Sequence, residues 1–173
     1  MKILFLSILS ISLFFINPVS SEQKISFIDM DRVISTSKSG SSILKQLNIL
    51  KDKNLKFLEN EGEILKEKET KLISQKNIIS EADFKNKIDE LKAEIRKYNQ
   101  NRNKLIEDFN KLKVNNTNNL LKLINPILIK FSNEEGISII LQKKNLVVAK
   151  TELDITEEII KIINTEVKEF KIK

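Results

Sequence analysis

Of the chain's 173 residues, 31% are charged and only 6% are aromatic, and the formal net charge is +6. Without Cys or His, the chain can form no disulfide and has neither a thiol nucleophile nor the commonest general base and metal ligand. Three Gly and two Pro leave room for few turns, so long exposed helices are favoured over a thick globular core.

Residues 1–21 have the layout of a secretory signal peptide. Lys2 precedes an apolar run from Ile3 to Ile16, and small residues precede Glu22. The run is shorter than the roughly 18–20 residues that span a bilayer, so an uncleaved membrane anchor is the alternative. We expect cleavage before Glu22 and a mature chain outside the cytoplasm.

The mature chain opens with a short β-rich run, and residues 25–28 are expected to form a strand. Asp29 or Asp31 then caps a helix, because an Asp oxygen accepts from the free N–H groups of a first turn. The polar residues 35–40 indicate either a frayed turn or a kink, and the helical pattern resumes at Ser41.

One long helix is expected over residues 43–79. The second set of positions on its apolar seam is apolar near the start of the helix, at Leu47 and Leu55, but polar further along. Gly62 lies inside the helix and lowers its local stability. The helix therefore has a full seam near its base and half a seam toward its far end. The main seam residues recur at multiples of seven and are Leu44, Leu58, Leu65, Leu72 and Ile79.

A second helix follows a turn at residues 79–83, where Ser80 and Asp83 have the spacing of a helix cap. The Asn-rich run 115–119 interrupts its seam and leaves open whether the helix is continuous there. This narrow stripe predicts a partner helix and hence a long antiparallel hairpin, whereas a compact bundle would need wider apolar faces. Its apolar residues alternate four and three apart, except where Arg102 occupies a seam position, and are Phe84, Ile88, Leu91, Ile95, Tyr98, Leu105, Phe109 and Leu112.

Residues 120–131 are apolar on most sides and are expected to be buried. Pro126 should kink this helix or begin a new one, and Gly136 is placed to cap its C-terminus. The polar stretch Asp154–Glu157 has the pattern of a capping box before a final amphipathic helix that carries Ile155, Ile159, Ile162, Ile163 and Val167.

Residues 137–142 and 146–149 are expected to form two strands, joined by a hairpin loop at 143–145 in which Asn145 takes a positive φ. Both faces of these strands carry apolar side chains and must be covered. Because the chain supplies so few strands, we expect other copies of the chain to cover them. The expected oligomerisation residues are Ile25, Phe27, Ile137, Ile139, Leu141, Val147 and Val148.

The half seam leaves apolar side chains facing outward near the end of the hairpin, among lysines. Such a surface usually marks a binding partner, and this one suits varied, often acidic, polypeptide clients or an anionic membrane surface. The alternatives are packing inside the hairpin for the apolar residues and an ordinary solvated face for the lysines. The candidate client-binding residues are Leu58, Leu65, Leu72, Ile73, Ile78, Ile79, Lys71, Lys76, Lys85 and Lys87.

Residues 24–40 resemble the opening of the OmpH/Skp family of periplasmic chaperones, and residues 136–142, 146–149 and 154–160 are similar to that family's close. The order of signal peptide, strand, charged hairpin, strands and helix is also the family's. The resemblance implies a homotrimer shaped like a jellyfish, in which helical arms surround a cavity below a β body. It also implies ATP-independent holding of unfolded outer-membrane proteins in the periplasm.

The expected fold is therefore mainly α with a small β body and a long antiparallel helical hairpin. The body comprises residues 22–42 and 120–173, and the arm comprises residues 43–119. The expected function is that of a periplasmic holdase chaperone without enzymatic activity or cofactor. The alternative is a structural coiled-coil envelope or adaptor protein. Nucleic acid is not an expected partner, because aromatic residues are not interleaved with the basic ones and the signal peptide takes the chain out of the cytoplasm.

Overall fold

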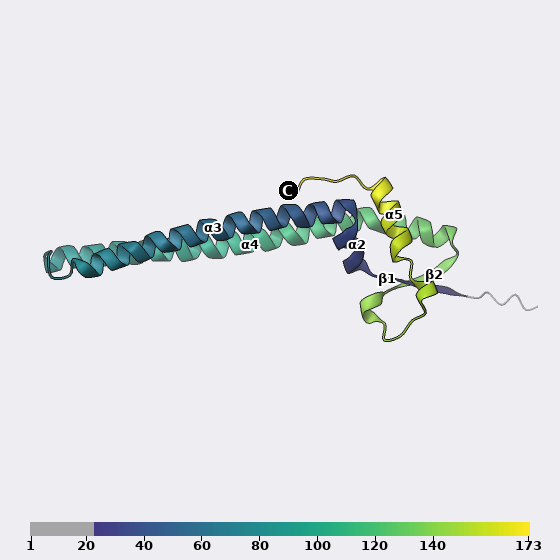
Figure 1. Ribbon diagram of the computed structural model, residues 1–173, viewed down its shortest axis with the longest axis horizontal. Coiled ribbons are helices and arrows are strands. Elements are labelled where there is room, and N and C mark those ends of the chain that lie inside the picture. The colour runs from purple at the N-terminus through teal and green to yellow at the C-terminus, as the bar shows by residue number, and fades with distance from the viewer. Residues whose placement is uncertain (1–22) are drawn as a thin grey trace, which may run out of the picture.

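The computed structural model describes residues 23–173, which form a small α/β body and a long helical arm (Figure 1). The predicted signal peptide and its cleavage site before Glu22 lie outside the described residues. The elements in order are β1 (Lys24–Ile28), α2 (Met30–Thr36), α3 (Lys38–Ser74), α4 (Glu81–Glu134), β2 (Ile137–Gln142), the 3-10 turns η1 (Lys143–Asn145) and η2 (Thr151–Leu153), and α5 (Thr156–Glu166).

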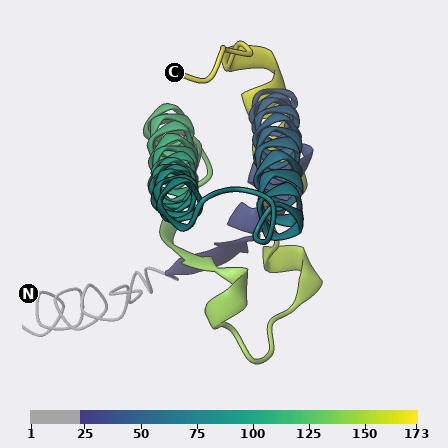
Figure 2. The ribbon, with the colours of Figure 1, turned by 90° about the vertical axis from the view of Figure 1, so that its left-hand side faces the viewer.

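The arm is an antiparallel hairpin of α3 and α4, as the seam pattern predicts (Figure 1, Figure 2). The 37 residues of α3 correspond to about 55 Å of helix. The turn lies at residues 75–80, slightly before the predicted position. Ser80 caps α4 by accepting a hydrogen bond from the Asp83 backbone N–H at 3.1 Å. Glu81 and Asp83 lie in the first turn of α4 and not in the connection between the helices. Acidic side chains are favoured there by the helix dipole.

Helix α4 runs without a break through the Asn-rich run 115–119 and through Pro126. The Asn run therefore does not break the helix, which answers a question that the sequence left open. Asn116 explains why, because its side-chain amide donates to the Leu112 carbonyl one turn earlier at 2.7 Å and so bonds along the helix rather than ending it. Pro126 removes one backbone donor, and its ring lies on the exposed side of the helix.

A kink at Ser37 separates α2 from α3, which settles the choice left open by the polar run 35–40. Ser37 ends α2 and begins α3, and its hydroxyl accepts from the Gly40 backbone N–H at 3.3 Å. Of the two aspartates considered as caps for α2, Asp29 takes the role by accepting from the Arg32 N–H at 2.9 Å.

The two strands β1 and β2 pair in parallel, with Ile25 opposite Ile139 and Phe27 opposite Leu141. Both were predicted as strands, but the predicted third strand at 146–149 and its hairpin are wrong. Residues 143–145 form the 3-10 turn η1, and no residue other than Gly in the described chain has a positive φ, so Asn145 has none either. Within residues 23–173 no strand pairs with 146–149 to complete a ladder, and Val147 and Val148 are 99% and 89% exposed.

The hydrophobic core lies where the base of the arm meets the body. It brings together α2, the start of α3, the C-terminal half of α4, the sheet and α5. Its fully buried side chains include Val33, Leu120, Ile124, Ile159 and Ile163, each 0% exposed. The predicted burial of the apolar stretch after the Asn run is thus confirmed for Leu120 and Ile124 but is wrong for Leu123 and Ile129, which are 46% and 63% exposed.

The predicted capping box before α5 forms only in part. Asp154 accepts from the Thr156 N–H at 3.0 Å, but Glu157 reaches Arg32 at 2.5 Å instead of folding back to the cap. Partial burial alone would raise the pKa of Asp154, but hydrogen bonds from Thr156 and the nearby Lys143 ammonium outweigh it and hold that pKa below its usual value.

Two glycines of α3 offer a matched test of this packing. At Gly40 an added Cβ would collide with the Ile34 carbonyl group, whose carbon would lie 2.8 Å away, whereas at Gly62 the nearest atom would be the Tyr98 hydroxyl at 3.5 Å. We expect Gly40→Ala to lower the free energy of unfolding by about 2 kcal/mol through overpacking. Gly62→Ala should instead raise helix stability by about 1 kcal/mol. Urea unfolding followed by circular dichroism measures both, and equal effects would contradict the packing of α2 on α3.

Candidate functional site

The arm helices meet along one narrow seam, which its side-chain contacts define. The Tyr98 hydroxyl on α4 donates to the Leu58 carbonyl on α3 at 3.2 Å, and Gly62 leaves space beside the tyrosine ring. Nearer the tip, Lys68 and Glu94 join the two helices with an ion pair of 2.6 Å. Most seam residues are only half-buried, because each helix has a single neighbour in the arm and the rest of its surface faces solvent.

Three predicted client-binding leucines belong to this seam rather than to the outer surface. Leu72 is only 8% exposed, and Leu58 and Leu65 are half-buried, as is Ile79 in the turn. The prediction that Leu72 faces outward is wrong, because its position in the heptad turns it toward α4. Leu55, predicted as a seam residue, is instead 54% exposed.

Other apolar side chains of the arm do face outward. Ile73 and Ile78 are 64% and 79% exposed, in agreement with the prediction for these two residues. Sequence reasoning missed most of the remainder, although Phe57 and Ile64 recur seven residues apart beside the seam positions Leu58 and Leu65. The further exposed apolar residues of α3 and α4 away from the body are Ile49, Leu55, Phe57, Ile64, Ile95, Ile106 and Val114.

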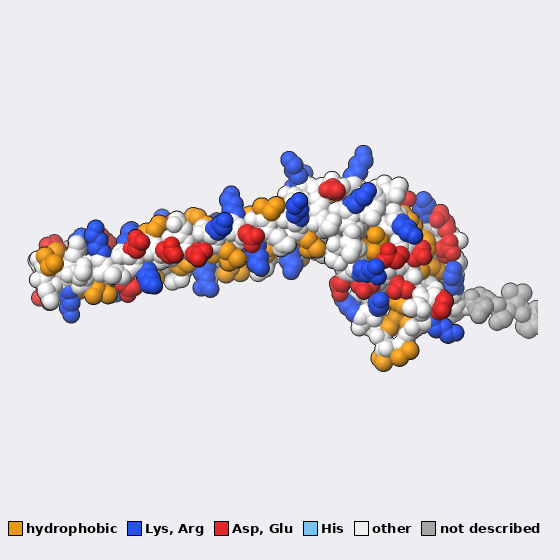
Figure 3. Space-filling model, in the orientation of Figure 1, with side chains coloured by type: hydrophobic (Ala, Val, Ile, Leu, Met, Phe, Trp, Pro, Cys, Tyr) orange, Lys and Arg blue, Asp and Glu red, His pale blue; other side chains and the backbone are white. Residues whose placement is uncertain are grey.

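The tip of the arm contains a charged groove of about 350 Å³. Two of the predicted lysines, Lys71 and Lys87, line it, together with the apolar residues Leu72 of α3 and Leu91 of α4. Lys76 and Lys85 do not line the groove and lie exposed near the turn. Halfway along the arm, a second hollow of about 320 Å³ lies between Phe57 of α3 and Leu105 of α4. Figure 3 shows basic, acidic and hydrophobic side chains interspersed along the arm.

One face of the two-stranded sheet is largely uncovered. Ile25, Ile139 and Leu141 share this face through their strand register and are 41%, 44% and 40% exposed. Of the other predicted oligomerisation residues, Phe27 and Ile137 are already buried within the chain. Val147 and Val148 project into solvent from the loop before η2, and hydrophobic atoms gather at that end of the body in Figure 3.

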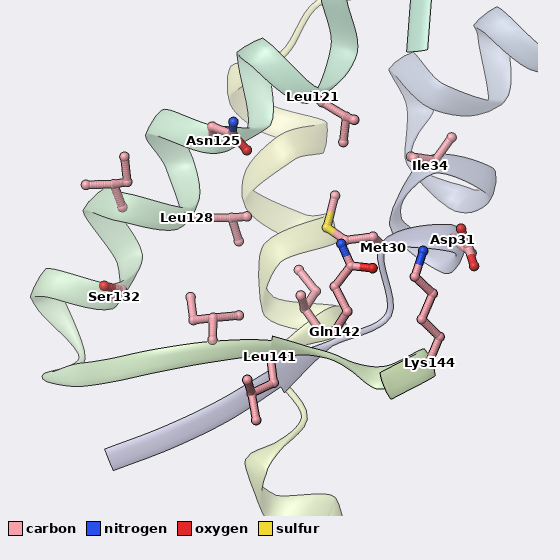
Figure 4. A pocket seen from close by; sticks show the side chains of 13 residues that line it. Met30, Asp31, Ile34, Leu121, Asn125, Leu128, Ser132, Leu141, Gln142 and Lys144 are labelled. Carbon is pink, nitrogen blue, oxygen red and sulfur yellow. The ribbon is translucent and has the colours of Figure 1, made fainter. Parts of the chain in front are cut away.

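The opposite side of β2 borders a pocket of about 560 Å³ between α2, α4 and the sheet. Met30 and Leu128 project toward each other across this pocket, whereas Leu141 projects from the other side of the strand (Figure 4). The body therefore presents apolar surface on both sides of β2.

Within residues 23–173, no group of three or more metal-ligating side chains is arranged to hold an ion. No helix in the same range is long and apolar enough to cross a membrane. The grooves and apolar patches of the arm and body are thus the features of the described chain from which a function can be argued.

Comparison with known proteins assigns this architecture to a family. A family model described as "Outer membrane protein (OmpH-like)" matches residues 24–163. The crystal structure of a protein from Caulobacter crescentus CB15, proposed to be an OmpH-like outer membrane chaperone, is similar with a TM-score of 0.78. That likeness has 13% sequence identity, covers 87% of this chain and 89% of the other, and concerns the fold alone. No curated protein matches the chain.

A small α/β body with a long helical arm is thus the architecture of an OmpH-like chaperone fold. Because the family model matches most of its length, the chain belongs to the OmpH-like family. The resemblance inferred from its two ends is confirmed, and so is the predicted mainly α fold with a small β region.

Leu72 and Ile73 are adjacent residues that test the division between seam and outer surface. Leu72→Ala should lower the opening free energy of the arm tip by about 2 kcal/mol, since it removes a buried side chain. Ile73→Ala should change it by less than about 0.5 kcal/mol, because that side chain is mostly in solvent. Hydrogen exchange of the amides near the turn measures the difference, and the reverse order would place Ile73 in the seam.

Proposed function

We propose that the chain is an ATP-independent periplasmic chaperone that holds unfolded outer-membrane proteins and prevents their aggregation. Its membership in a chaperone family supports this function. The observation that carries the proposal is the row of apolar side chains exposed along a thin, highly charged arm. An unfolded chain exposes apolar segments in no fixed order, and a surface of scattered apolar contacts can accept many of them.

The charges of the arm fit the same role. Lys71, Lys76, Lys85 and Lys87 surround the tip, and Lys71 and Lys87 line its groove. Such charges speed the encounter with acidic clients without fixing one binding geometry. They would also allow the tip to contact an anionic membrane surface. Because the apolar contacts are not screened, added salt should weaken client capture only in part.

The proposal includes a homotrimer held by the body. Its support is the uncovered face of Ile25, Ile139 and Leu141, together with the unpaired stretch around Val147 and Val148. A sheet of two strands with an exposed apolar face is marginal alone, and strands from other copies would extend and cover it. Three arms projecting from such a body would surround a cavity in which a client is held.

The client surface can be tested with three substitutions on the outer face of the arm. Phe57→Ser, Ile64→Ser and Ile106→Ser remove exposed apolar side chains and leave the seam intact. We expect this variant to lose most of its ability to suppress aggregation of an unfolded outer-membrane protein, measured by light scattering after dilution from urea. The matched control is Asn60→Ser, Asn103→Ser and Asn110→Ser, which changes exposed polar residues of the same helices.

Both variants should keep the helix content and oligomeric mass of the wild type. If the apolar variant suppresses aggregation as well as the control does, the exposed apolar row is not the client surface. A wild-type protein without any such activity would favour the alternative, a structural coiled-coil envelope or adaptor protein.

The oligomer can be tested separately from the client surface. Ile139→Lys with Leu141→Lys places two charges on the uncovered sheet face and should convert a trimer into monomers, because lysine cannot be buried there unpaired. Asn101→Lys with Asn103→Lys adds the same charge on the exposed side of the arm and should leave the trimer unchanged. Light scattering coupled to gel filtration measures the mass. A wild-type monomer, or a trimeric body variant, would contradict the proposed assembly.

A further inference from the structure

The segment after α5 is held in an unusual way. Helix α5 ends at Glu166, and residues 167–173 continue as an extended chain that forms no helix or strand ladder. Figure 1 shows this segment, here called the tail, running from α5 back along the base of the arm, and Figure 2 shows it running from the side of α3 toward α4. The tail lies beyond residues 24–163, the part of the chain that the family model matches.

Two side-chain amides, one from each arm helix, hold the tail by its backbone. Gln46 of α3 donates to the Phe170 carbonyl at 3.0 Å and accepts from the Ile172 N–H at 3.2 Å. Asn116 of α4 donates to the Lys173 carbonyl at 3.2 Å and accepts from the Lys173 N–H at 3.4 Å. Each amide thus meets one carbonyl and one N–H group, as a neighbouring strand would, and neither contact depends on a side chain of the tail.

The side chains of the tail alternate in their burial. Phe170 and Ile172 are half-buried and pack against the core, whereas Lys171 and Lys173 on either side of Ile172 point to solvent. Asn116 is 2% exposed and is one of the few buried polar residues of the described chain. A buried amide is costly unless its donors and acceptors are paired, and beyond its own helix the tail backbone supplies these partners.

We propose that this surface, formed by Gln46, Asn116 and the apolar residues under Phe170 and Ile172, is a binding site for extended polypeptide, with the tail as its built-in occupant. Its ligand is a strand-like segment with apolar side chains at alternate positions, recognised through its backbone. Recognition of this kind tolerates many sequences, as in other sites that bind extended peptides by main-chain hydrogen bonds.

The tail is suited to leave this site. Beyond Val167, which is 9% exposed and belongs to the core, the tail is held by a few hydrogen bonds and two half-buried side chains, whereas α5 before it is anchored in the core by Ile159 and Ile163. A tethered tail competes with any incoming peptide at an effective concentration in the range of about 1 mM. Only a segment that is locally concentrated, or that makes further contacts elsewhere, displaces it. If the proposed function holds, a client bound along the arm meets that condition, and to this extent the inference rests on that function.

The site can be probed with a fluorescent synthetic peptide of sequence 167–173 added to the full chain. In wild type the tail occupies the site, so binding should be weak. Phe170→Ser with Ile172→Ser removes the apolar anchors of the tail and should strengthen peptide binding at least tenfold, measured by fluorescence anisotropy. Lys168→Ser with Lys171→Ser changes only exposed residues of the tail and should behave as wild type.

The two amides are tested in the variant whose tail is detached. Gln46→Glu with Asn116→Asp keeps the side-chain shapes but removes both donors, so peptide affinity should fall about tenfold. Asn48→Asp with Asn118→Asp adds the same charge at exposed positions two residues away and should leave the affinity unchanged. Equal losses in the two variants would overturn recognition through the backbone.

If detaching the tail unfolds the body, displacement of the tail can still be measured with a fluorescent label in the otherwise unaltered chain. Because the chain has no Cys, Lys171→Cys carries a single fluorophore on an exposed position of the tail. Unlabelled peptide at millimolar concentration should displace the tail and increase the mobility of the label. The proposal is overturned if the label does not respond, or if the folded detached variant binds peptide no better than wild type. Neither readout depends on suppression of aggregation, so failure of the site and failure of the proposed function can be told apart.

Discussion

The structure depends on one helix that serves two parts of the molecule. The first part of α4 supplies half of the arm seam, and its last part supplies Leu120 and Ile124, which are 0% exposed in the core of the body. Because a helix is stiff over this length, the direction of the arm is fixed by the packing of those two residues against α5 and the sheet. The base of the arm is therefore held in a fixed orientation to the body because α4 is continuous through Asn116.

Local patterns made much of this fold predictable. The heptads, the cap at Ser80 and the positive φ of 64° at Gly136 all depend on residues within a few positions of one another. The errors occur where the outcome depends on distant partners. Residues 146–149 have the composition of a strand, but no other strand in the described part of the chain pairs with them. The continuity left open at the Asn run has the same origin, since the run has the composition of a loop, yet Asn116 is held in the helix by Leu112 and by the backbone of Lys173.

The candidate site was predictable in kind but less so in its members. Because the seam of the first arm helix is only half apolar, the sequence predicts exposed apolar residues on the arm. Their positions depend on which of two adjacent heptad positions faces the other arm helix. Leu72 and Ile73 show the consequence, since one is 8% and the other 64% exposed. The clasp of the tail by Gln46 and Asn116 left no signal in the sequence, because single amides on a polar helix are common and their partners lie 124 and 57 positions away.

The parallel pairing of β1 with β2 has a consequence for how the chain folds. Lys24 at the start of β1 meets Glu135, which is 111 positions away, and nearly everything between them is the hairpin. Closing so long a loop is slow if the intervening chain is disordered, but a hairpin built from local contacts brings its own two ends together first. The arm then acts as a folded spacer. The pairing of β1 with β2 depends on the positions of the two ends of the arm and not on the length of the arm. Removing or adding whole heptads in both helices together would change the reach of the arm and leave the assembly of the sheet almost untouched.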